Sequence, residues 1–142
     1  MVTVDRKITK EKNTQVTAIS AIIKRLENYK DLPFIEKLPF VVDFILDNQF
    51  KENIQKIYLF GSYAYGTPHS KSDLDICVIV DDTVMDKRKE IYCTIELRIY
   101  KEKIIPSDLL ICGASAFNEK KDIQKIERVV FLYGELIYAR NY

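Results

Sequence analysis

The sequence has few of the residues that build zinc or disulfide sites. It contains one histidine, His69, and three widely spaced cysteines, Cys77, Cys93 and Cys112. Structural zinc sites need histidine and cysteine ligands at close, regular spacing, so we expect no zinc site. The first residues also lack the apolar segment of a secretory signal. We therefore expect a cytoplasmic protein whose cysteines are reduced.

Long hydrophobic runs and an excess of one charge sign are also missing. No apolar run reaches the roughly 18 residues of a transmembrane helix, so we expect no membrane span. The chain has 22 Lys and Arg residues against 21 Asp and Glu residues, a net charge of +1. This balance excludes the broad positive surface of a protein that binds extended nucleic acid. With 142 residues, of which 47% are hydrophobic, a globular chain with one main domain is predicted.

Hydrophobic patterns predict a chain that alternates between helices and strands. Residues 84–101 fit both periods, and their charged content favours a helix. Pro39 is suited to a first helical position, and Gly134 to a helix stop. We expect a mobile arm over 1–14, helices over 16–26, 39–50, 84–101 and 117–133, strands over 54–60, 73–80 and 104–112, and a short strand or tail over 135–140.

Two acidic residues stand at the start of the second predicted strand, DLDICVIV. Side chains two residues apart share a strand face, so Asp73 and Asp75 lie with Cys77 and Ile79, and the opposite face is wholly apolar. Two carboxylates at this spacing repel each other unless a cation lies between them, and they can converge on one divalent ion. The Ser-x-x-Asp pattern ending at Asp75 also resembles a helix capping box, a reading that the strand-forming residues after it weaken.

Asp108 is the third candidate acid. It lies among apolar residues of the third predicted strand, and its parity groups it with Pro106 and Leu110. If this strand lies beside DLDICVIV, Asp108 can join Asp73 and Asp75. Three carboxylates are a ligand set that suits magnesium, which takes the rest of its shell from water and phosphate. An ordinary turn residue after Pro106 is the alternative for Asp108.

The loop between the first two strands offers candidate phosphate contacts. Gly61 and Ser62 follow a strand, and the short segment after them can open a helix, whose free amide groups attract anions. Gly61 lets the backbone approach a phosphate closely, and the Ser62 hydroxyl can donate a hydrogen bond. Tyr63 and Lys71 are further nucleotide-binding candidates, for which a packed tyrosine and a solvated lysine are the plainer alternatives.

The stretch GSYAYGTPHSKSDLDICVIV resembles the signature of the DNA polymerase β-like nucleotidyltransferase superfamily. In that signature, ten residues separate a Gly-Ser pair from Asp-x-Asp, as they do here between Ser62 and Asp73. Size and layout resemble the minimal nucleotidyltransferase (MNT) domains over about residues 39–139. The resemblance implies an α/β (α+β) nucleotidyltransferase fold, a small mixed sheet with helices mainly on one face. We expect an N-terminal arm and helix over 1–31, and this domain over 32–142.

The same resemblance implies a chemistry and a partner. One or two Mg²⁺ ions would be held by Asp73, Asp75 and Asp108, and Asp108 would accept a proton. Gly61 and Ser62 would hold the phosphates of ATP. Family members of this size are often antitoxins of a HEPN-domain RNase toxin, and some transfer AMP to a toxin tyrosine, which we adopt as the leading hypothesis.

Two other functions stay open from the sequence. One is a catalytically idle antitoxin that neutralises its partner by contact. The other is a nucleotidyltransferase for small molecules, with an active site completed in a homo-oligomer. Many relatives also have an arginine after the Gly-Ser pair, where this chain has Tyr63, so its nucleotide affinity or choice can differ.

Overall fold

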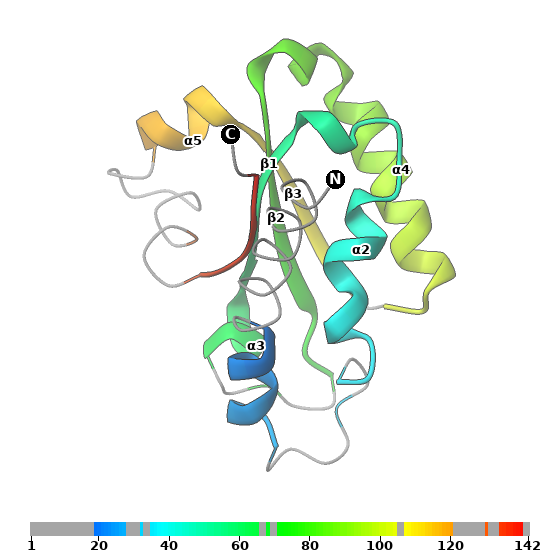
Figure 1. Ribbon diagram of the computed structural model, residues 1–142, viewed down its shortest axis with the longest axis vertical. Helices are drawn as coiled ribbons and strands as arrows, with labels where there is room; N and C mark the ends of the chain where they lie inside the picture. Colours follow the sequence, from blue (N-terminus) through cyan, green and yellow to red (C-terminus); the bar gives the residue numbers. More distant parts are fainter. Residues whose placement is uncertain are drawn as a thin grey trace, which may run out of the picture.

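A four-stranded mixed sheet forms the centre of the molecule, with strand order β3-β2-β1-β4 (Figure 1). The computed structural model describes residues 19–27, 32, 35–65, 68, 71–104, 107–120, 130 and 134–140. The strands are β1 (Ile54–Phe60), β2 (Leu74–Val80), β3 (Ser107–Gly113) and β4 (Glu135–Ala139). β1 pairs antiparallel with β2 and with β4, and β2 pairs parallel with β3. The predicted mixed sheet and the strand over 135–139 are confirmed.

The helices follow the predicted order. They are η1 (Leu38–Phe40), α2 (Val41–Leu46), η2 (Lys51–Asn53), α3 (Gly61–Tyr65), η3 (Asp82–Lys87), α4 (Arg88–Lys101) and α5 (Ala114–Lys120). Within the described part of the chain, no helix combines the length and apolar character needed to cross a membrane.

The ambiguous stretch over 84–101 is helical, and α4 begins later than the pattern predicts. The Asp81 side chain accepts a hydrogen bond from the Thr83 amide, which holds the preceding turns as the 3₁₀ helix η3. The helix expected from Phe117 begins earlier, at Ala114, because the Asp82 carboxylate accepts the Ser115 amide. The rest of that predicted helix lies largely outside the described residues, although the Gly134 amide still donates to the Val130 carbonyl.

The two faces of the sheet pack against different helices. The main hydrophobic cluster joins apolar residues of β1, β2 and β3 to α2 and α4, which Figure 1 shows together on one side of the sheet. A smaller cluster on the other face joins Tyr58, Cys77, Ile79 and Cys112 to Phe117 of α5. Helices therefore cover mainly one face, as predicted.

A helical segment over residues 19–25 packs on the main cluster. Ile19, Ile22 and Leu26 are buried there, which confirms the predicted apolar face of this helix. The segment therefore shares its core with the sheet, and a domain boundary at residue 31 stays a prediction. The expected mobile arm lies outside the described residues.

α4 offers a matched test of this packing. Ile95 is fully buried in the main cluster, and Leu97 on the same helix is 56% exposed. We expect Ile95→Ala to lower the free energy of unfolding by about 2–5 kcal/mol, because it leaves a cavity in the core. Leu97→Ala should change it by less than about 0.5 kcal/mol. Urea denaturation measures both, and equal losses would contradict the proposed packing of α4.

Candidate active site

The predicted acidic cluster forms where β2 and β3 begin. Asp75 and Asp108 are direct partners in the parallel β2–β3 pairing. Both point to the sheet face opposite the main cluster, because Leu74, Ile76 and Leu109 occupy the main-cluster face. Asp73 immediately precedes β2. The predicted placement of Asp108 beside the second strand is confirmed at Asp75, and its grouping with Asp73 stays a prediction.

The Gly-Ser turn lies directly against this cluster. β1 ends at Phe60, which pairs with Asp75, and α3 begins at the next residue, Gly61. Gly61 has φ +73°, a conformation that side chains with a Cβ rarely adopt. A Cβ there would lie 2.8 Å from Cγ of Asp75 and nearer still to Oδ2. Glycine is thus required both by the backbone conformation and by the carboxylate packed against it.

The acids influence one another electrostatically. Burial raises the pKa of Asp75 from its ordinary value of 3.8 to about 6, and the charges of Asp108 and Asp73 raise it further in the same direction. Asp75 is partly buried, and the other two acids are exposed. A carboxylate whose pKa is raised by the charges of neighbouring carboxylates is in an environment that attracts a cation.

The donor set fits Mg²⁺ in its chemistry. Carboxylate oxygens are the ligands that this ion takes from proteins, alongside water and phosphate. Among the residues that the structure describes, however, no three acidic, histidine or cysteine side chains are close enough together to form a metal-binding group. The acids are therefore neighbours with a shared electrostatic field, and no coordination geometry follows from their positions.

The loop candidates have different environments. Ser62 is partly exposed at the start of α3, and Lys71 is exposed near Asp73. Tyr63 is 1% exposed and belongs to the main hydrophobic cluster, which favours the alternative of a packed tyrosine over a ring that stacks on a base. Tyr65 is 47% exposed on the same short helix. His69 lies outside the described residues, and nucleotide contacts of Gly61, Ser62 and Lys71 stay predictions.

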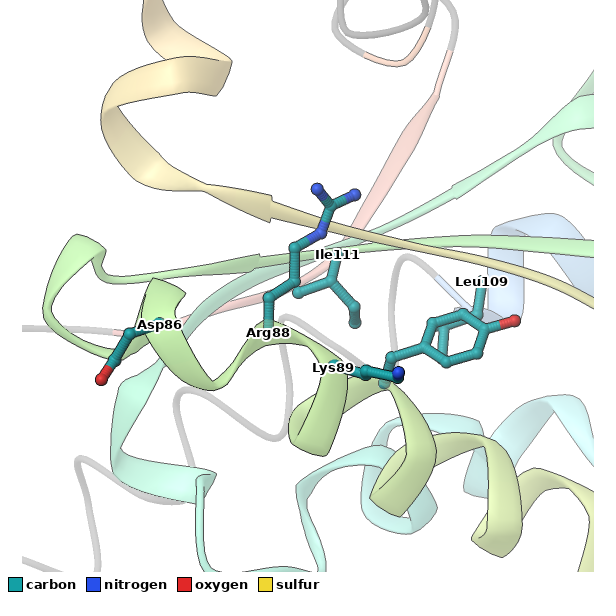
Figure 2. A pocket seen from close by; sticks show the side chains of 6 residues that line it. Asp86, Arg88, Lys89, Leu109 and Ile111 are labelled. Carbon is teal, nitrogen blue, oxygen red and sulfur yellow. The ribbon is translucent and has the colours of Figure 1, made fainter.

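A groove beside β3 was not anticipated from the sequence. It has a volume of about 490 Å³ and is lined by residues of η3, α4 and β3 (Figure 2). The lining residues are Asp86, Arg88, Lys89, Tyr92, Leu109 and Ile111. One feature of the sequence could have indicated this groove. Arg88 and Lys89 lie in the first turn of α4, where the helix dipole disfavours cations, so two basic residues there suggest a role other than helix stability.

Tyr92 connects this groove with the acidic cluster. Burial raises the pKa of Tyr92, as do its hydrogen bond with Glu96 and the charges of Glu96 and Asp108. Asp108 is thus close enough for its charge to act on a residue that lines the groove. The adjoining residue of β3, Leu109, also lines it.

Comparison with known proteins identifies the family. The nucleotidyltransferase domain family matches residues 41–131, well over half of the chain. The chain belongs to this family. The matched region contains Gly61, Ser62 and all three acids, and the predicted family is confirmed.

Individual relatives of this nucleotidyltransferase are similar over shorter or looser matches. The protein adenylyltransferase MntA of Shewanella oneidensis is 58% identical over 31 residues, which span 22% of this chain and 22% of that protein. A mutant toxin–antitoxin complex MntA-HpeT matches with 24% identity, covering 71% and 72% of the two chains, at TM-score 0.44. A toxin–antitoxin structure with AMP-PNP matches at 25% identity, 71% and 73% coverage and TM-score 0.43. TM-scores below 0.5 are too low to carry over partners or ligands.

The contact between Gly61 and Asp75 gives a double-mutant test. Gly61→Ala should destabilise the chain by more than the roughly 1–2 kcal/mol that a left-handed conformation costs an alanine, because the new methyl group also displaces the Asp75 carboxylate. In an Asp75→Ala background no carboxylate is displaced. The loss of stability caused by Gly61→Ala should then fall to the cost of the left-handed backbone conformation alone. Urea denaturation of the four chains measures this coupling. The same cost in both backgrounds would show that the carboxylate does not press on Gly61.

The raised pKa of Asp75 predicts how stability depends on pH without divalent ions. The folded chain retains this proton up to about pH 6, and the unfolded chain releases it near 3.8. The resulting stabilisation is complete below the unfolded pKa and is lost as pH rises through the folded pKa. In EDTA, we therefore expect Asp75→Asn to melt at a higher temperature than the wild type near pH 7.5, and the two to converge near pH 4.

Two controls complete this pH experiment. Asp43→Asn, at an exposed position on α2, is the matched control for replacing one carboxylate by an amide. Added Mg²⁺ should stabilise the wild type near pH 7.5 more than Asp75→Asn, because it neutralises the ionised cluster. A difference between wild type and Asp75→Asn that does not change with pH would contradict the raised pKa.

Proposed function

We propose that this chain is a Mg²⁺-dependent nucleotidyltransferase that moves AMP from ATP to a hydroxyl group of a protein. The observation that carries the proposal is the pairing of Asp75 with Asp108 beside the Gly61 turn, with Asp73 directly before the strand. Membership of the nucleotidyltransferase domain family supports the reaction type. The match to a protein adenylyltransferase supports AMP as the transferred group and protein as the acceptor class.

Each residue then has a defined task in an in-line displacement. The acceptor oxygen attacks the α-phosphorus of ATP, the bond from that phosphorus to the bridging oxygen breaks, and pyrophosphate leaves with the electron pair. Asp108 accepts the proton of the attacking hydroxyl. Gly61 and Ser62 hold the β- and γ-phosphates, Gly61 by close backbone approach and Ser62 by its hydroxyl. Asp73, Asp75 and Asp108 would bind Mg²⁺, which when present neutralises charge on the phosphates.

We further propose that the acceptor is a tyrosine of a HEPN-domain toxin and that the chain acts as its antitoxin. The basis is the resemblance to minimal nucleotidyltransferases over the Gly-Ser and Asp-x-Asp positions, together with the adenylyltransferase match. The mechanism fits this acceptor, since a phenolic hydroxyl needs only one carboxylate to take its proton as the bond to phosphorus forms.

Label transfer from α-³²P-ATP with Mg²⁺ tests the reaction, using proteins that co-purify with this chain as acceptors. We expect a labelled partner band with the wild type and with Asp43→Asn, and at least a roughly hundredfold weaker band with Asp73→Asn, Asp75→Asn or Asp108→Asn. EDTA should abolish the label.

Other outcomes separate the competing functions. A stable complex with no label, and with neutralisation unchanged in Asp73→Asn and Asp75→Asn, would replace the proposal with an idle antitoxin that acts by contact. Label on aminoglycoside-like acceptors, and on no protein, would replace it with a small-molecule nucleotidyltransferase. Equal labelling by the wild type and the acid variants would remove the three acids from the reaction.

A further inference from the structure

In the part of the chain that the structure describes, the outer edge of β3 is unpaired next to the proposed reaction site. β3 is the outer strand of the sheet, and among the described residues it pairs with β2 alone. Asp108 is the second residue of this strand. An outer strand presents backbone amide and carbonyl groups that can pair with an added strand. A segment bound along β3 would therefore pass directly beside Asp108.

The groove beside this edge provides contacts for the side chains of such a segment. Its floor includes Leu109 and Ile111 of β3, and its rim carries Arg88 and Lys89 of α4. Figure 2 shows the labelled side chains that line this groove, with Asp86 at one end of the group. The groove thus combines an apolar floor with a basic rim.

The charges of the groove indicate the kind of segment that fits. Neither Arg88 nor Lys89 forms an ion pair with any residue in the described part of the chain. Asp86 is the single acidic residue among those that line the groove, and Glu90 of the same helical turn does not line it. The rim is therefore positive, and a negatively charged side chain is its complement.

We propose that an extended acidic segment of the acceptor protein pairs with the outer edge of β3 and places its hydroxyl at Asp108. This rests on the proposed function and identifies how that reaction selects its acceptor. Asp108 and Leu109 point to opposite faces of the sheet, because successive strand residues alternate. In the bound segment, the residue with the acceptor hydroxyl and the acidic residue must therefore also point to opposite faces of the sheet.

The alternation gives a sequence rule for the acceptor. The groove residues Leu109 and Ile111 are one and three positions along β3 from Asp108. A segment with its hydroxyl at Asp108 therefore has its acidic residues one or three positions away, beside Arg88 and Lys89. An acid two positions from the hydroxyl would point to the wrong face of the sheet.

Two synthetic peptides of equal composition test this rule. Each is a seven-residue, valine-rich peptide with one tyrosine, and glutamate stands either three or two positions from the tyrosine. Label transfer from α-³²P-ATP should give the odd-spaced peptide roughly tenfold higher kcat/KM, mostly through KM. The charge-reversed chain Arg88→Glu/Lys89→Glu should lose this preference and regain it for a peptide with lysine in place of glutamate.

Hydrogen–deuterium exchange provides a second readout that needs no chemistry. The odd-spaced peptide should slow amide exchange over residues 107–113 in the wild type and in Asp75→Asn, and not in the charge-reversed chain. If the β3 amides that do not bond to β2 are already protected in the free chain and do not respond to peptide, the outer edge is not available to an acceptor, and the proposal is overturned.

The two proposals fail in different ways. Labelled acceptors with no effect of peptide spacing or of Arg88→Glu/Lys89→Glu would leave the nucleotidyltransferase standing and overturn the docking. Protection of residues 107–113 that depends on charge, with no label on any acceptor, would support the docking and overturn the transferase. Nucleotide binding by the charge-reversed chain, measured with AMP-PNP, should equal that of the wild type, and a parallel loss would overturn the assignment of Arg88 and Lys89 to acceptor binding.

Discussion

The active end of this molecule depends on one close packing contact, between the carboxylate of Asp75 and the backbone of Gly61. The last residue of β1, Phe60, is paired with Asp75, so the chain must leave the sheet at the next residue without covering the carboxylate. A glycine at φ +73° allows this, and α3 starts in the same place. The contact fixes the Gly-Ser turn beside the acids, and it also takes Asp75 partly out of water.

The neighbourhood of Asp75 is unfavourable for its ionised form. A half-buried carboxylate with two acidic neighbours is harder to ionise, and the fold tolerates this because the opposite face of β2 is well packed. Leu74, Ile76 and Val78 are buried in the main cluster and hold the strand in place. Stability from one face of the sheet thus maintains an arrangement on the other face that favours binding of a cation.

Local patterns predicted most of the architecture. Strand β1 matches its predicted bounds, and the helix over 88–101 follows from charged residues around a buried isoleucine stripe, Ile91, Ile95 and Ile99. The starts of α4 and α5 differ from the predicted ones. Asp81 and Asp82 accept hydrogen bonds from the amides of Thr83 and Ser115, and hydrophobic periodicity does not reveal such contacts. The sequence alone leaves Tyr63 open between base stacking and packing, and the structure places its ring in the core.

The sequence by itself determined the chemical groups and their local spacing: glycine at the turn, two acids two residues apart at the start of a strand, and an apolar opposite face. These follow from backbone sterics and from the two-residue period of a strand, which depend on neighbours in the chain. Tertiary structure decided that β3 lies parallel to β2 with Asp108 opposite Asp75, and that Arg88 and Lys89 line one groove with Leu109 and Ile111 of β3. Strand order and register depend on how distant segments bury their apolar faces together, and a single segment does not contain that information.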